Sequence, residues 1–313
     1  MIYRQVSWET HSAALQRIRF DVFVDEQNVS QEEEWDEYDN AVTTLHFLAF
    51  DGESAVGTAR VIATSAKEFK IGRIAVLKHL RGKSIGAGLL IKATETCIDL
   101  GAKRMYMHAQ TDAQPFYEKY GYCAEGRIFD EAGIDHVLMT FVPDNAASIT
   151  AMYADRVIRH DSILPWRTHA HRCIALSQRS IYISSHQLRD DLFRAQNIVD
   201  ALSAFSRSDR RANVHILIHS KDTLKRSSVP MLELAKRLPS KIYVQVVHSD
   251  YDEAIDSFII GDNQFLSFFN NEDKLIGFTN YSARPESRKL IEQFQQLWAH
   301  HSAPNENLRN LTL

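Results

Sequence analysis

Residues 70–92 decide the fold of the first half of the chain. They read KIGRIAVL at 70–77, KHL at 78–80, Arg81-Gly82-Lys83-Ser84-Ile85-Gly86-Ala87-Gly88, and LLIK at 89–92. The β-branched run at 70–77 predicts a strand, and the apolar pattern of 86–100, followed by Gly101, predicts a helix. Glycines let a backbone approach a ligand closely, and the unbonded N–H groups at a helix start attract anions. This order therefore predicts an anion-binding loop; the alternative is a glycine-rich connector that binds nothing.

The elements around this loop indicate a mixed α/β domain. Helical spacing or strand-like runs predict helices at 9–23 and 113–120 and strands at 45–50, 55–64, 105–109 and 137–142. The segment around 142–148 contains Pro143 and small polar residues, which is typical of a boundary. We therefore expect one domain at 1–145 and a second at 146–313.

The loop resembles the signature of the GNAT superfamily of acyl-CoA-dependent N-acyltransferases. That signature is Arg/Gln-x-x-Gly-x-Gly/Ala after a strand, and Arg81, Ser84 and Gly86 stand in its defining positions. Ser84 departs from the usual glycine, although it still offers its backbone N–H. The run at 73–76 resembles the family's bulged strand, and FYEKYGY at 116–122 is similar to the family's Phe-Tyr-Glu-Lys-x-Gly-Phe stretch.

A shorter resemblance points to one branch of the superfamily. The run RFDVFVDEQ at 19–27 is similar to the Arg-x-x-Val-Phe-Val-x-Glu-Gln stretch of the ElaA-type branch. An acidic loop and a later histidine, here His46, also occur in that branch. The resemblance implies a mostly antiparallel mixed sheet with flanking helices over residues 1–145.

The resemblance also implies acetyl-CoA as cosubstrate and a set of residues that bind it. These residues are Ile74, Ala75, Val76, Arg81, Gly82, Lys83, Ser84, Ile85, Gly86, Ala87, Gly88, Phe116 and Tyr117. The Val76 N–H would stabilise the oxyanion, and Tyr117 would protonate the leaving thiolate. The alternative for Tyr117 is a core aromatic side chain.

The base that deprotonates the acceptor amine is less defined by the sequence. We select Glu26, with Glu33, Glu34, His46, His108 and a water chain as alternatives. The acidic run at 31–39 is either a solvated face or an attraction for a cationic amine such as a polyamine.

The second domain, 146–313, is predicted to be another layered α/β unit. It resembles one half of a phospholipase D-like fold, whose catalytic His, Lys and Asp would fall on Ala254, Asp256 and Gly261. All three chemical groups are missing, so we expect no phosphodiesterase activity, because such enzymes need the histidine nucleophile. We therefore expect this domain to be an accessory or dimerisation domain, or to present a surface that binds RNA. The histidine spacings match no metal motif.

Composition limits the other classes of function. The chain has 313 residues, a net charge of −4 and three cysteines, which we expect to be buried thiols. It has no apolar run long enough to span a bilayer, so we expect a cytoplasmic protein without a membrane partner. The sequence thus predicts an N-acetyltransferase that acts on a small-molecule or protein amine through a ternary complex, without a metal. The alternative is an acyl-CoA-sensing or RNA- or protein-binding protein without turnover; a nucleic-acid partner is disfavoured, and a homodimer is left open.

Overall fold

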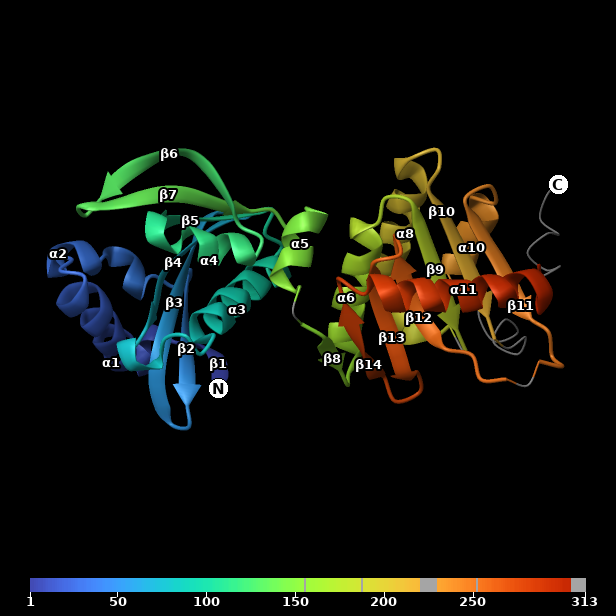
Figure 1. Ribbon diagram of the computed structural model, residues 1–313, viewed down its shortest axis with the longest axis horizontal. Helices are drawn as coiled ribbons and strands as arrows, with labels where there is room; N and C mark the ends of the chain where they lie inside the picture. Colours follow the sequence, from blue (N-terminus) through green and yellow to red (C-terminus); the bar gives the residue numbers. More distant parts are fainter. Residues whose placement is uncertain (155, 187, 220–229, 252, 305–313) are drawn as a thin grey trace. The chain divides into compact units, whose positions relative to one another are not determined.

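The chain folds as two compact units, Met1–Met152 and Tyr153–Leu313. The computed structural model describes residues 1–154, 156–186, 188–219, 230–251 and 253–304 (Figure 1). The domain boundary expected after residue 145 lies before α5 (Ala146–Met152), whereas α5 is part of the first unit. Gly121 lies directly against the backbone of Ser148 in α5, so this short helix is packed onto the unit that precedes it.

The first unit is built on a seven-stranded sheet in the order β1-β2-β3-β4-β5-β7-β6. Its strands are β1 (Ile2–Val6), β2 (Thr44–Asp51), β3 (Ser54–Ser65), β4 (Glu68–Val76), β5 (Arg104–Gln110), β6 (Cys123–Glu131) and β7 (Ile134–Phe141). All neighbouring pairs are antiparallel except β4 and β5. This is the mixed, mostly antiparallel sheet that the sequence predicts.

Helices cover both faces of the centre of this sheet. The longer ones are α1 (Trp8–Arg19) and α3 (Ile85–Asp99), and Figure 1 shows them on either side of β2 and β3. The shorter ones are a π-helix η1 (Phe20–Glu26), α2 (Gln31–Glu34), η2 (Glu37–Asn40), η3 (Lys78–Leu80), η4 (Thr111–Ala113) and α4 (Gln114–Lys119). Leu15 and Ile18 of α1 pack on Leu48 and Ala75. Because both faces are covered, β2 and β3 are buried along most of their length.

The centre of the sheet opens between β4 and β5. These strands pair in parallel only over Glu68–Lys70 and Arg104–Tyr106, although β4 continues to Val76 and β5 to Gln110. A register shift between Thr58 and Arg60 places a bulge in β4, and Arg73 there has φ of +52°. The bulge turns β4 away from its neighbour, and the two strand ends therefore leave room for a site.

The second unit contains an eight-stranded sheet in the order β15-β11-β10-β9-β12-β13-β14-β8. Its strands are β8 (Ile158–His160), β9 (Ser180–Ser185), β10 (Asn213–Ile218), β11 (Ile242–Val247), β12 (Ser257–Gly261), β13 (Phe265–Asn271), β14 (Ile276–Asn280) and β15 (Ser302–Pro304). Its helices are α6 (Ile163–Leu176), α7 (Asp190–Phe193), α8 (Gln196–Ser208), α10 (Pro230–Arg237) and α11 (Arg284–His300). Strands β9, β10 and β11 are parallel, and the other pairs are antiparallel.

Two apolar layers hold this second unit together. One lies under α6, α8 and α10, and the other lies under α11, where Phe294 packs on Phe258 and Leu266. The second α/β unit is therefore as predicted. Of the three cysteines, Cys97 and Cys173 are buried but Cys123 is exposed, so the expectation of three buried thiols is wrong for Cys123, which begins the edge strand β6. Among the described helices, none is long and apolar enough to cross a membrane.

Candidate active site

The glycine-rich loop leads from the end of β4 into α3 and lines a cavity of about 450 Å³. The lining residues are Val76, Arg81, Gly82, Ser84, Ile85, Gly86, Ala87, Phe116, Lys119 and Tyr120. The N–H groups of the first turn of α3 have no partner within the helix. Together with the positive helix end and the side chain of Lys119, they suit an anion such as a diphosphate. We call this space the loop cavity.

Ser84 adopts the backbone conformation for which glycine is normally required. Its φ of +59° and ψ of +19° lie in the left-handed region, immediately before α3 begins, and its side chain makes no capping hydrogen bond. A side chain is strained in this conformation, whereas glycine adopts it freely. The structure thus gives a physical reason for glycine at this position of the signature, and it shows that serine preserves the shape of the turn.

Gly88 has a packing role in this loop. A side chain at Gly88 would overlap the ring of Tyr3 in β1, and Gly88 does not line the loop cavity. Lys83 and Ala75 also lie outside its lining, and Ala75 is buried in the core under α1. These three predicted cofactor residues are therefore placed beside the loop cavity, while the other loop residues form it.

Glu26 is paired with the first residue of the loop. Arg81 donates to both Glu26 carboxylate oxygens, at 2.6 and 2.8 Å, and its Nε donates to the Val76 carbonyl at 3.0 Å. The hydrogen bond from Arg81 holds the pKa of Glu26 below its ordinary value. A carboxylate held in this way is a weaker proton acceptor, and Glu26 lines neither cavity of the site. This geometry argues against our selection of Glu26 as the base and gives it a role in holding the loop.

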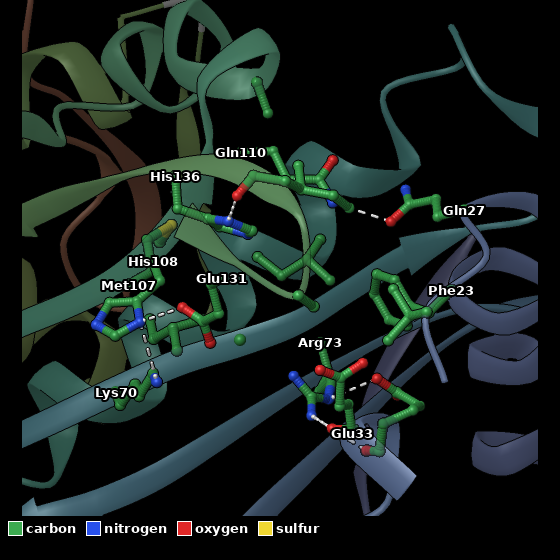
Figure 2. A pocket seen from close by; sticks show the side chains of 18 of the residues that line it. Phe23, Gln27, Glu33, Lys70, Arg73, Met107, His108, Gln110, Glu131 and His136 are labelled. Atoms are coloured by element: carbon green, nitrogen blue, oxygen red, sulfur yellow. Dashed lines mark hydrogen bonds and ion pairs between the residues drawn. The ribbon is translucent and has the colours of Figure 1, made fainter. Parts of the chain in front are cut away.

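A second cavity, of about 430 Å³, occupies the opening between β4 and β5. We call it the acceptor pocket, and Figure 2 shows most of its side chains. Its walls come from the 20–34 segment, from β4 and β5, from α4, and from the β6–β7 hairpin. The lining residues are Phe23, Gln27, Val29, Glu33, Glu34, Lys70, Ile71, Gly72, Arg73, Ile74, Met107, His108, Gln110, Ala113, Tyr117, Glu131, Ala132, Ile134 and His136.

Neighbouring residues of β4 and α4 line the two cavities. Ile74 and Tyr117 line the acceptor pocket, whereas Val76 and Phe116 line the loop cavity. The rings of Phe116 and Tyr117 are 5.0 Å apart. A molecule held by the loop could therefore extend past Val76 and present its far end beside Tyr117.

Tyr117 keeps its phenolic proton in this position. Burial raises its pKa to about 12, and its hydroxyl makes no hydrogen bond to any described residue. A phenol that remains protonated and has no competing partner is suited to donate a proton to a leaving group. Its ring also packs against those of Phe116 and Tyr122.

Two histidines on neighbouring strands bring ring nitrogens to the acceptor pocket. His136 Nδ1 lies 2.8 Å from the Ile134 carbonyl oxygen, and His108 Nδ1 lies 2.6 Å from a Glu131 carboxylate oxygen. A carbonyl or carboxylate oxygen only accepts, so each Nδ1 carries a hydrogen and each neutral ring keeps its lone pair on Nε2. In Figure 2 the second nitrogen of His108 points away from the other labelled residues.

Three of the six acids of the run at 31–39 enter a largely buried ion-pair network. The network consists of Arg19, Arg60, Arg73, Glu34, Asp36 and Asp39. Arg19 and Glu34 are 1% and 2% exposed, and Arg19 Nε donates to Glu34 at 2.5 Å. Burial alone would raise the pKa of Asp39, but the hydrogen bonds and charges of Arg19 and Arg60 outweigh it and lower that pKa. Three arginines thus balance three of the acids, and neither the solvated face nor a cation trap describes them.

Two other candidate bases, His46 and Glu33, make structural contacts in the first unit. His46 is buried, its Nε2 lies 3.0 Å from the Asp39 carbonyl, and it does not line the acceptor pocket. Glu33 is exposed and accepts from Ser30 as a helix cap. Lys70, Glu131 and His136 were missed by the sequence reasoning, because they lie on ordinary strand positions without a motif.

The second unit shows no comparable site at the predicted phospholipase D-like positions. Asp256 precedes β12, and its carbonyl accepts from Ser184 Oγ at 2.7 Å. A side chain at Gly261 would overlap Ser177 Oγ, so this position has no room for a carboxylate. In the described part of the chain, no group of three or more His, Cys, Asp or Glu side chains is placed to hold a metal ion.

Comparisons with known proteins match the two units separately. Residues 12–142 match the family model described as "Acetyltransferase (GNAT) domain", and residues 164–311 match a "Domain of unknown function (DUF7931)". The phospholipase D-like interpretation of the second unit therefore remains a prediction. The chain is 42% identical over 124 residues to the "Uncharacterized N-acetyltransferase YjcF" of Bacillus subtilis, covering 39% of this chain and 86% of that protein.

The ElaA protein of Escherichia coli is similar over the same region. It is 33% identical over 129 residues, covering 40% of this chain and 84% of ElaA. Its crystal structure superposes with a TM-score of 0.41 and 28% identity, covering 44% of this chain and 97% of that structure.

Proposed function

The chain belongs to the GNAT acetyltransferase family, and we propose that its first unit transfers an acyl group, normally acetyl, from acyl-CoA to a primary amine in a ternary complex. The observation that carries this proposal is that neighbouring residues of β4 and α4 line both cavities, with Val76 in the wall of one and Tyr117 in the wall of the other. A CoA diphosphate held by the N–H groups at the start of α3 would direct the thioester along β4 into the acceptor pocket.

The chemistry requires a neutral amine, a stabilised oxyanion and a protonated leaving thiol. In the proposed mechanism His136 Nε2 accepts the amine proton, the amine nitrogen bonds to the acyl carbon, and the C–S bond breaks. The Val76 N–H faces the developing oxyanion, and Tyr117 donates its proton to the thiolate. The fixed Nδ1–H of His136 supports its choice as base over Glu26.

The remaining assignments complete the proposal. Ile74 and Val76 offer main-chain groups to the pantetheine arm, and Arg81 and Lys119 face the diphosphate. The acceptor is a small amine, because the acceptor pocket is a cavity of small-molecule size. The proposed place of the reaction is the cytoplasm. The second unit is an accessory unit without catalysis of its own.

A Tyr117→Phe variant tests this function against acyl-CoA sensing. We expect kcat to fall by about 10²–10⁴-fold, the usual range for loss of a general acid. Acetyl-CoA affinity should stay at the wild-type value, because the hydroxyl lies outside the loop cavity. Turnover is measured by release of free CoA and affinity by calorimetry. Unchanged turnover in Tyr117→Phe would remove its role, and wild-type binding without turnover on any amine would favour the sensor.

A further inference from the structure

We propose that the acceptor is an amine that also bears an anionic group, a carboxylate or a phosphate, and that Lys70 binds this group. The inference rests on the proposed function and identifies the class of its second substrate. An α-amino acid is the simplest molecule of this class.

The acidic side chains of the acceptor pocket are already engaged. Glu34 accepts from Arg19 at 2.5 Å and faces Arg73 at 3.0 Å. Glu131 Oε2 lies 2.6 Å from His108, and Glu33 accepts from Ser30 at 3.0 Å. A purely cationic acceptor would therefore have to compete with existing partners for every carboxylate.

Lys70 differs from these carboxylates, because it has no oppositely charged partner among the described residues. Its ammonium has three donors and lies 3.5 Å from His108 Nδ1, but that nitrogen donates to Glu131 and therefore cannot accept from Lys70. No described carboxylate forms an ion pair with it. Desolvation lowers the pKa of Lys70, and the nearby charge of Glu131 offsets only part of this effect. A ligand anion would supply the acceptor oxygens that this half-buried cation lacks.

Three groups that line the pocket then match three parts of one reacting complex. Lys70 would receive the anion, His136 Nε2 the amine hydrogen, and Tyr117 the thiolate. Figure 2 shows Lys70 on β4 and His136 on β7 bordering the same pocket, so one small molecule can reach both. The arginine at the other side of the pocket, Arg73, already faces Glu34 at 3.0 Å, and its Nη2 donates to the carbonyls of Glu33 and Glu34.

The test uses acceptors that differ only in the anionic group. The pairs are ornithine and putrescine, lysine and cadaverine, phenylalanine and phenethylamine, with phosphoethanolamine and ethanolamine as the phosphate arm. Each is assayed by free CoA release with the wild type, with Lys70→Met, and with Lys67→Met. Lys67 is exposed, lies outside the pocket, and controls for the loss of one positive charge.

We expect the wild type to prefer the anionic member of a pair by about tenfold to a hundredfold in kcat/KM, the effect of one charge-assisted hydrogen bond. Lys70→Met should remove this preference mainly through KM, and Lys67→Met should keep it. Acetyl-CoA binding should be equal in all three proteins, which shows that they are folded.

Each contrary outcome has a separate meaning. Turnover with equal kcat/KM within every pair, or an equal loss for both members in Lys70→Met, would overturn this inference alone. Acetyl-CoA binding by the wild type without turnover on any acceptor would overturn the proposed function, and this inference with it.

Discussion

Two neighbouring glutamates should respond in opposite ways to the same substitution. Glu34 is 2% exposed and faces both Arg19 and Arg73, whereas Glu33 is exposed and its carboxylate accepts a hydrogen bond from Ser30. We predict that Glu34→Gln destabilises the first unit and that Glu33→Gln does not. The pair is matched in chemistry and differs only in surroundings.

The magnitude follows from the buried network. Burial raises the pKa of Glu34 although Arg19 and Arg73 act to lower it, so the loss comes from the arginines that are left without a counter-charge. Removing one charge of a buried pair in this way costs about 3 kcal/mol or more. For a unit of this length, about 3 kcal/mol lowers Tm by roughly 6–12 °C. Glu33→Gln removes one exposed capping contact and should stay within about 0.5 kcal/mol.

The assay must separate the two units of the chain. Hydrogen exchange measured by mass spectrometry in increasing urea does this, with peptides from β2 reporting the first unit and peptides from β9 the second. We expect the midpoint of β2 to fall in Glu34→Gln while that of β9 is unchanged. If Glu34→Gln unfolded like the wild type and instead raised KM for amines, the network would not be structural and the acidic run would serve the acceptor.

Acid should weaken the second unit, because burial lowers the pKa of His160 to about 4 and of His169 to about 2, below the unfolded value near 6.5. The unfolded chain then binds more protons than the folded one. The contribution of these histidines to the free energy of unfolding is therefore complete above about pH 6.5 and falls by about 1.4 kcal/mol per histidine per pH unit below it. Urea midpoints of the second unit at pH 7 and pH 5 check this, and equal midpoints would contradict it. Gly88→Ala should cost about 1–3 kcal/mol in thermal unfolding, because its methyl group overlaps Tyr3; an unchanged Tm would refute that packing role. Glu26→Gln should lower kcat by less than about tenfold and leave the acidic limb of the pH–rate profile, whereas a 10²-fold loss with that limb removed would restore Glu26 as the base.

The parts of the fold that local sequence determines were predictable. The strand–loop–helix at 70–100 depends on glycines, a β-branched run and an apolar pattern within one short stretch, and β4, α3 and the loop cavity follow from it. The helix α6 was not predicted, although Trp166, Ala170 and Ile174 have helical spacing, because polar side chains separate them. Strand β6 was missed because it is exposed over most of its length and shows no alternation.

The acceptor pocket depends on contacts that no local pattern contains. Lys70, Glu131 and His136 meet because β4 leaves β5 after three paired residues and the β6–β7 hairpin contributes to the pocket wall. Glu26 was selected as a base from its residue type and its motif. Its true partner, Arg81, is 55 positions away in the chain, and only the folded structure brings them together.

Binding of acetyl-CoA, measured by calorimetry on the wild type and on Gly86→Glu, tests the central claim most directly. An added Cβ at Gly86 would lie 3.8 Å from both Val76 and Phe116, so a carboxylate there enters the loop cavity without disturbing the fold. We predict micromolar binding by the wild type, lost in Gly86→Glu at an unchanged Tm. A wild type that does not bind acetyl-CoA would contradict the assignment of the loop, and binding that survives in Gly86→Glu would place the cofactor elsewhere.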